Sequence, residues 1–134
     1  MEHSYASPSK GSGFTLIEIL LVLAIIGILA GIAWPGYAAQ QRQAVAREGA
    51  LSLLVFASLQ ERLRMARGSY QPVEVLQTLR QLPARVADVY RLDIELGAGG
   101  ANYLMSLSPV QQNSHYRSLS LDNVGRRQPA DIWP

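Results

Sequence analysis

The stretch Gly13-Phe14-Thr15-Leu16-Ile17-Glu18 opens a long apolar run that decides how this chain folds. Residues 14–39 contain a single charged side chain, Glu18, and residues 19–34 contain none. About 20 predominantly apolar residues span the hydrocarbon core of a bilayer, so the run is long enough for a transmembrane helix. The insertion free energy of its aliphatic side chains exceeds the cost of one carboxylate near the end of the span.

A secretory signal or a generic signal anchor is the simplest alternative explanation of such a run. A secretory signal has its cleavage site after the apolar region, next to small residues. Here a polar leader, MEHSYASPSKGSG, comes first, and Glu18 lies inside the apolar run. A carboxylate within a membrane segment is costly and usually functional, so the order of residues disfavours both alternatives.

The residues Gly13-Phe14-Thr15-Leu16-Ile17-Glu18 and the apolar stretch after them resemble the class III signal and N-terminal helix of type IV pilins and pseudopilins. The resemblance implies that a prepilin peptidase cuts between Gly13 and Phe14, removes residues 1–13 as a leader, and methylates the new N-terminal Phe14. It also implies that Glu18 pairs with the Phe14 amino group of a neighbouring subunit. Such a cation is the partner that a carboxylate in hydrocarbon requires.

Two further residues of the apolar run match family positions where the helix loosens on assembly, Gly27 and Pro35. Glycine lowers helix stability by about 1 kcal/mol. Proline removes a backbone hydrogen bond and clashes with the preceding turn. We therefore expect a kink near Pro35.

The apolar run continues into an amphipathic segment, which predicts one helix over residues 14–67 with Gly68 as its C-terminal cap. Residues 14–39 would form its transmembrane or assembly half, and residues 40–134 a globular head that includes its second half. The apolar positions expected to pack into the head recur at i+4. They are Leu51, Val55, Leu59 and Leu63, joined by Leu54.

The rest of the head alternates between turn signals and short periodic segments. A short helix is predicted over residues 72–82, stopped by Pro83, and apolar alternation predicts strands over residues 90–96, 103–109 and 117–121. The expected fold class is α+β, as in the type IV pilin fold: a long N-terminal helix, kinked near Pro35, packed against a small antiparallel sheet.

The C-terminal part carries a second resemblance, to the tail of minor type IV pilins of the PilE kind. It rests on residues 103–109 with Gln112, on residues 119–125, and on Trp133. Those proteins usually close this tail with a disulfide, whereas this chain has no cysteine. We therefore expect hydrophobic packing centred on Trp133 to hold the tail, since a buried tryptophan and a disulfide stabilise small domains by similar amounts.

The side-chain inventory argues against catalysis. His115 is the single histidine after the leader, and neither cysteine nor a recognisable nucleophile motif is present. The four aspartates of the head, Asp88, Asp93, Asp122 and Asp131, lack the spacing of a calcium loop. No catalytic residue, cofactor or metal site is predicted.

Every basic residue after the leader is an arginine, and five lie between Arg42 and Arg67. Arginine binds phosphate well, so nucleic acid is a possible partner. An interface or solvated role is favoured, with Glu48 and Glu61 or neighbouring subunits as partners.

Together these features predict a minor pilin, a structural subunit of a type IV pilus that serves adhesion, twitching motility or DNA uptake. Its expected partners are other pilin subunits, the prepilin peptidase, the inner-membrane assembly platform and, before assembly, the inner membrane. The chain would cross that membrane once, with a periplasmic head, and end in a surface pilus or a periplasmic pseudopilus. Two alternatives remain: a pseudopilin of a type II secretion system, and a signal-anchored periplasmic binding module.

Overall fold

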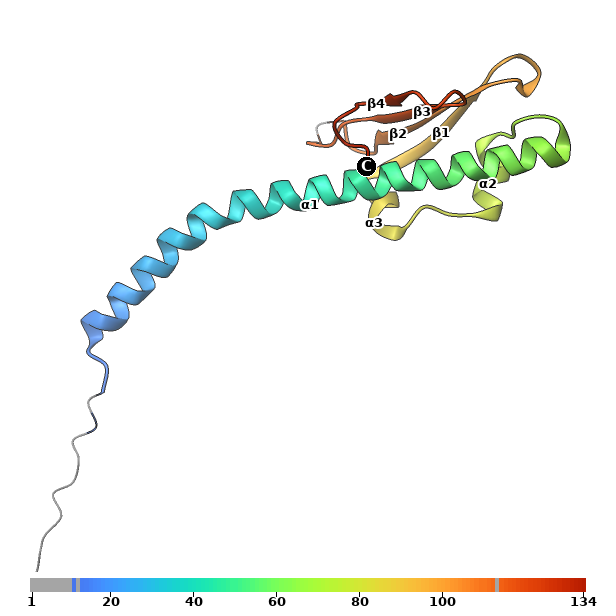
Figure 1. The fold of residues 1–134 in the computed structure, drawn as a ribbon. Coiled ribbons are helices and arrows are strands. Elements are labelled where there is room, and N and C mark those ends of the chain that lie inside the picture. The colour runs from blue at the N-terminus through green and yellow to red at the C-terminus, as the bar shows by residue number, and fades with distance from the viewer. Residues whose placement is uncertain (1–10, 12, 113) are drawn as a thin grey trace, which may run out of the picture. The chain divides into compact units, whose positions relative to one another are not determined.

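The computed structural model describes residues 11, 13–112 and 114–134. Three helices, α1 (Leu16–Arg67), α2 (Val73–Leu79) and α3 (Ala84–Ala87), precede the sheet (Figure 1). The strands are β1 (Tyr90–Leu96), β2 (Tyr103–Pro109), β3 (Leu119–Asp122) and β4 (Arg127–Gln128), with a 3-10 turn, η1 (Ala98–Gly100), between β1 and β2. The chain separates into two compact units, which meet between Tyr37 and Ala38.

Helix α1 begins two residues later than expected and ends where the sequence predicts. The terminal cap is confirmed, because Gly68 adopts a φ of 82° and its N–H donates to the carbonyl oxygen of Arg64 at 2.7 Å. This left-handed residue satisfies one of the open carbonyls at the helix end. Pro35 lies inside the helix, and the kink expected there stays a prediction.

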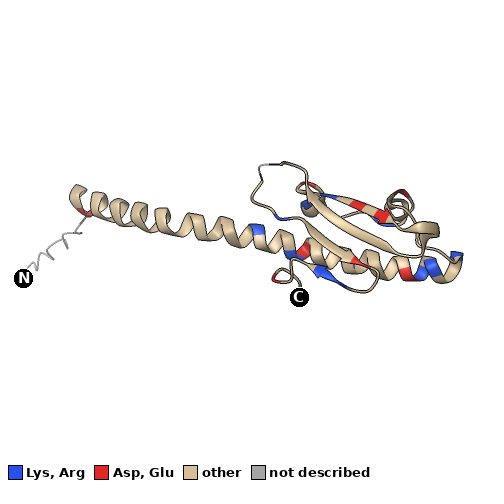
Figure 2. Ribbon diagram, turned by 90° about the horizontal axis from the view of Figure 1, so that it is seen from above, with Lys and Arg blue, Asp and Glu red and all other residues tan. Residues whose placement is uncertain are grey.

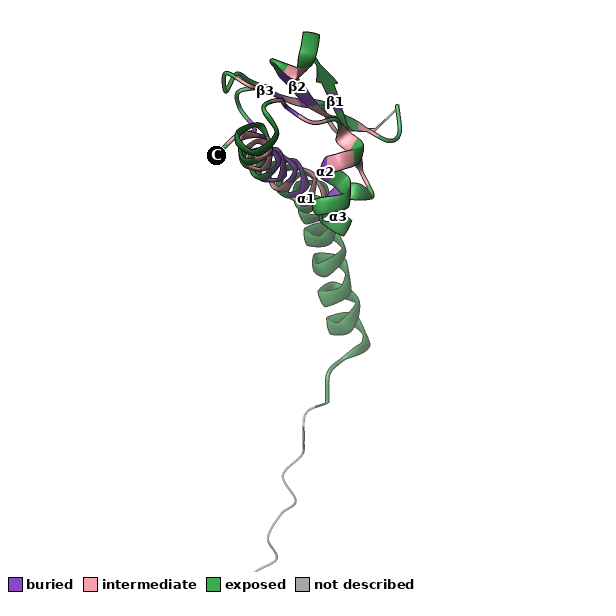
Figure 3. Cartoon of the chain, turned by 90° about the vertical axis from the view of Figure 1, so that its right-hand side faces the viewer, coloured by how far each residue is buried: buried purple, intermediate pink, exposed green. Residues whose placement is uncertain are grey.

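The head, Ala38–Pro134, contains a four-stranded antiparallel sheet with the order β1-β2-β3-β4. Its inner face packs on the second half of α1, where the buried positions concentrate (Figure 3). Inward residues pair across the strands, for example Ile94 with Met105, and Met105 with Leu121. The space between the sheet and α1 is filled by large side chains, mainly leucines, one methionine and tyrosines.

Strands β1 and β2 have the predicted bounds, and the other predictions for the head need correction. The third strand covers Leu119–Asp122 instead of residues 117–121, and β4 was not predicted because two residues carry no periodic signal. The helix expected over residues 72–82 ends at Leu79, and α3 follows Pro83. Proline disfavours helical geometry in the residue before it, which explains the extended link between these two helices.

The predicted core face of α1 was wrong in part: Leu54, Leu59 and Leu63 pack against the core, whereas Leu51 and Val55 do not. Leu51 is 50% exposed and Val55 36% exposed. The buried stripe instead mixes steps of three and four residues: Val45, Ala46, Gly49, Ala50, Ser52, Leu53, Phe56 and Gln60. Successive residues turn by about 100°, so a repeat of four drifts around the helix and leaves any single face. At Gly49 an added Cβ would lie 3.1 Å from Leu107 Cδ1, so the sheet crosses α1 closely at this glycine.

Candidate functional site

The predicted cleavage site lies in an extended segment before α1. Gly13, Phe14 and Thr15 have no regular secondary structure and are exposed, with Phe14 at 79%. Most of the predicted leader, residues 1–10 and 12, lies outside the described residues. The bond between Gly13 and Phe14 is therefore open to an enzyme in this chain.

Helix α1 starts at a reciprocal cap between Thr15 and Glu18. The N–H of Glu18 donates to Thr15 Oγ1 at 3.3 Å, and the N–H of Thr15 donates to Glu18 Oε2 at 3.4 Å. This is a capping box, which satisfies two of the open N–H groups at a helix start. Our sequence interpretation missed the role of Thr15, although the spacing T-x-x-E before an apolar run is its usual signature.

The first half of α1 exposes its apolar side chains. All residues from 13 to 37 are exposed, and α1 is long and apolar enough to cross a membrane. A Cβ added at Gly27 would meet no atom within 4 Å, so this glycine is not required by packing within the chain. An apolar surface of this extent needs lipid or other subunits to cover it.

In the head, two polar contacts join the C-terminal end of α1 to the loop that follows it. The fully buried side chain of Gln60 accepts from the Gln71 N–H at 2.9 Å and donates to the Gln71 carbonyl oxygen at 2.7 Å. The Tyr70 hydroxyl donates to Glu61 Oε1 at 2.7 Å and accepts from Arg64 Nη1 at 2.9 Å. Burial, followed by the bond to Glu61, raises the pKa of Tyr70.

Trp133 lies in the head, apart from the other predicted site residues. Its ring is half-buried against the core and lies under the Arg127 guanidinium, 5.6 Å from the ring centroid. The indole Nε1 is buried without a hydrogen-bond partner among the described residues. The neighbouring Ile132 is the more deeply buried of the two, at 8% exposure.

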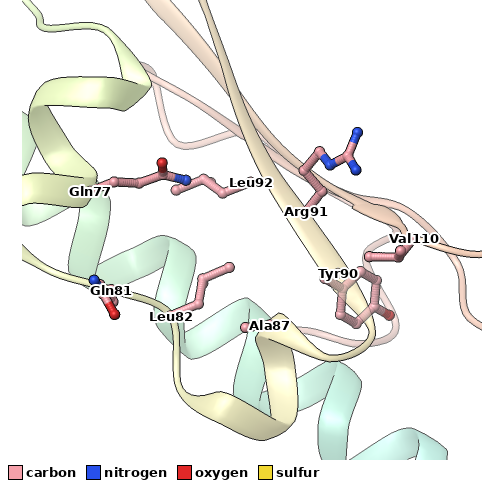
Figure 4. A pocket seen from close by; sticks show the side chains of 8 residues that line it. All are labelled: Gln77, Gln81, Leu82, Ala87, Tyr90, Arg91, Leu92 and Val110. Atoms are coloured by element: carbon pink, nitrogen blue, oxygen red, sulfur yellow. The ribbon is translucent and has the colours of Figure 1, made fainter.

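A cavity in the head offers little chemistry. It measures about 390 Å³ and lies between β1 and the α2–α3 segment (Figure 4). The lining residues are Gln77, Gln81, Leu82, Ala87, Tyr90, Arg91, Leu92 and Val110. Burial, together with the nearby Tyr116, raises the pKa of Tyr90 to about 12, so its hydroxyl stays protonated at neutral pH. Within the described residues, His, Asp and Glu side chains form no cluster of three or more that could hold a metal ion.

These features define a chain with an exposed apolar helix and a small α+β head. Residues 8–34 match the family model of the prokaryotic N-terminal methylation motif. Two sequences described as type IV major pilin protein PilE1 from Neisseria gonorrhoeae are each 28% identical to this chain, over 120 and 109 residues. The matches cover 90% and 81% of this chain, which spans 66% of the length of each relative.

A solved structure supports the same fold. The type IV pilin from Shewanella oneidensis aligns with a TM-score of 0.51 and 22% identity, over 66% of this chain and 92% of that one. This chain is therefore similar to type IV pilins in its N-terminal motif, in its sequence and in its fold. The pilin family and fold, to which this chain is similar, are those of structural subunits and not of enzymes. The motif and the apolar helix are consistent with membrane anchoring and pilus assembly.

Proposed function

We propose that the chain is a minor pilin, inserted once in the inner membrane with its head in the periplasm and then assembled into a type IV pilus. The prepilin peptidase cleaves after Gly13 and methylates Phe14, and the inner-membrane assembly platform extracts the subunit. The observation that carries the proposal is the methylation motif at the start of a helix whose first half exposes its apolar side chains. No residue that the structure describes covers this first half, so a polymer of such helices would supply the cover.

Glu18 would set the register of this polymer. In the filament its carboxylate pairs with the Phe14 amino group of a neighbour, while Gly27 and Pro35 let the helix adapt. The Glu18 carboxylate is exposed, and among the residues that the structure describes its partner is the Thr15 N–H at the start of the same helix. It is therefore available for a second, charged partner.

The assignment as a minor subunit rests on the resemblance of the C-terminal tail alone. The relatives found do not support it, because they are named major pilins. A deletion strain of the native host tests the function. We expect altered piliation, with defects in adhesion, twitching motility or DNA uptake and with normal protein secretion. Filaments sheared from wild-type cells should contain the chain at a small fraction of the major subunit. A secretion defect with normal pili would instead identify a pseudopilin.

A further inference from the structure

The head has an amphipathic groove between α1 and α2, here called the arginine groove. It has a volume of about 250 Å³ and is lined by Val55, Ser58, Leu59, Arg62, Leu79 and Arg80. Leu79 is 56% exposed and Val55 36% exposed, so the groove presents apolar surface to solvent. No carboxylate lines it.

The two guanidinium groups of this groove are unpaired. Arg62 and Arg80 make no ion pair or side-chain hydrogen bond with any residue that the structure describes. By contrast, the neighbouring Arg64 and Arg67 bond to Tyr70 and Gln71. Two like charges at one cavity repel each other, and an acidic ligand relieves this repulsion.

The outer face of the sheet carries carboxylates, opposite in charge to the two arginines of the groove, and one exposed apolar residue. Leu104 is 42% exposed on β2, and the strand register places it between Glu95 on β1 and Asp122 on β3. Asp93 is exposed two residues before Glu95 and lies on the same face, about 7 Å away. We call Asp93, Glu95 and Leu104 the acidic patch. Asp122 is not part of it, because its side chain is 21% exposed and pairs with Arg126 at 3.7 Å, and Arg91 flanks Asp93 on the same face of β1. Acidic positions on the strands and basic positions at the C-terminal end of α1 are visible in Figure 2.

We propose that the acidic patch of one copy of this chain docks into the arginine groove of a second copy. Leu104 covers the apolar floor of the groove, and Asp93 and Glu95 pair with Arg62 and Arg80. The inner face of the sheet packs on α1, so the patch lies on the outer face, whereas the groove lies between α1 and α2. Each copy therefore keeps one surface free, and such a heterologous contact extends into an open chain where its rotation does not close a ring.

The inference rests on the proposed function, because it names a contact through which subunits assemble. Disulfide cross-linking tests it directly, since the natural chain has no cysteine. Two differently tagged full-length copies are expressed together in the native host, one with Ser58→Cys and the other with Leu104→Cys. We expect a mixed dimer after mild oxidation. In the control pair, Met65→Cys takes the place of Ser58→Cys, because Met65 lies on the same helix and is 84% exposed. This pair should give at least fivefold less mixed dimer.

Charge reversal supplies the second arm. Arg62→Glu with Arg80→Glu in the Ser58→Cys copy should reduce the mixed dimer severalfold. Asp93→Arg with Glu95→Arg in the other copy should restore it. Arg85→Glu is the control, because Arg85 lies outside the groove and bonds to Gln41. The proposal is wrong if no mixed dimer forms, if the reversal has no effect, or if Leu104→Cys alone cross-links to itself.

Failure of this contact is distinguishable from failure of the proposed function. Both copies are examined for loss of the leader, which depends on residues 13–18 and not on the head. A processed chain that reaches filaments without the mixed dimer would overturn the docking proposal alone. An unprocessed chain would overturn the proposed function, whatever the dimer yield.

Discussion

The Glu18 carboxylate has two roles in this account. In the described chain it caps α1 together with Thr15, and in the proposed filament it pairs with an amino group. Glutamine replaces glutamate in a capping box, because its carbonyl oxygen accepts the same N–H. It does not replace the charge, so the two roles are separable.

We predict that Glu18→Gln and Glu18→Val are both processed normally, because neither changes Gly13 or Phe14. Both should fail to enter filaments, since both lose the charge pair. Thr15→Val should weaken only the cap and reduce assembly less. The measurement is the amount of each variant in sheared filaments relative to the membrane fraction. Normal assembly of Glu18→Gln would show that the charge is dispensable.

A second residue-scale prediction concerns Gln60, which is fully buried and satisfies both backbone groups of Gln71. Gln60→Leu keeps a similar volume but leaves the half-buried Gln71 N–H and carbonyl oxygen without their side-chain partner. A fully buried unsatisfied group costs about 1–3 kcal/mol, and these two groups are half-buried, so the free energy of unfolding should fall by about 1–2 kcal/mol. Urea denaturation in detergent measures this. Gln43→Leu, at an exposed position on the same helix, is the control and should have little effect.

At the scale of elements, strand bounds were easier to predict than the orientation of α1. Tyr90 to Leu96 alternates strictly, and a period of two permits only two choices of face. The apolar residues of α1 cover more than one face, so Leu51 and Val55 looked as suitable for the core as Leu53 and Phe56. Contact with the sheet decides between them. Gly49 marks the buried face, because a glycine inside a helix is costly unless close packing requires it.

Gly49→Val should therefore destabilise the head. Its Cβ would lie 3.1 Å from Leu107 Cδ1 and 3.3 Å from Leu119 Cδ1, before the two added methyl groups. Overpacking of this kind costs about 1–3 kcal/mol, which exceeds the gain in helix propensity. We expect a lower thermal midpoint. Gly36→Val, where an added Cβ meets no atom within 4 Å, should lack this packing penalty and change the midpoint of the head less.

The C-terminal tail gives a second prediction at this scale. Trp133→Ala should lower the thermal midpoint by several degrees and expose the tail to protease, because the ring packs on the core and under Arg127. Ile132→Ala should act in the same direction, since Ile132 is buried. Limited proteolysis followed by mass spectrometry locates the cut. If protease left the tail of Trp133→Ala uncut, packing of Trp133 would not hold the tail, and this residue would instead be a surface contact to a neighbouring subunit.

For the whole molecule, the N-terminal site was more predictable from sequence than the head. Gly13, Phe14 and Glu18 lie in a short contiguous motif, so proposing them as site residues needed no tertiary contact. The Gln60–Gln71 contact and the arginine groove join residues that are distant in sequence. Nothing in the local pattern of Arg62 or Arg80 indicates that they line one cavity.

The buried tyrosines predict how the stability of the head depends on pH. Burial raises the pKa of Tyr90 and Tyr103 to about 12, with Tyr116 adding to the first shift and Glu61 to the second. Since tyrosine ionises near pH 10 when unfolded, the stabilisation is complete below about pH 10 and is lost as the pH approaches 12. Each tyrosine should contribute a slope of roughly 1 kcal/mol per pH unit in that window. Urea midpoints of the full chain in detergent measure it, and Tyr103→Phe should flatten the decline.

The central claim is that this chain is a processed pilin subunit, and mass spectrometry of its N-terminus in the native host tests it most directly. The account predicts an N-terminal peptide that begins at Phe14 and carries one added methyl group. Gly13→Ala should slow or block this processing. An intact leader, or a cut at any bond other than that between Gly13 and Phe14, would contradict the account.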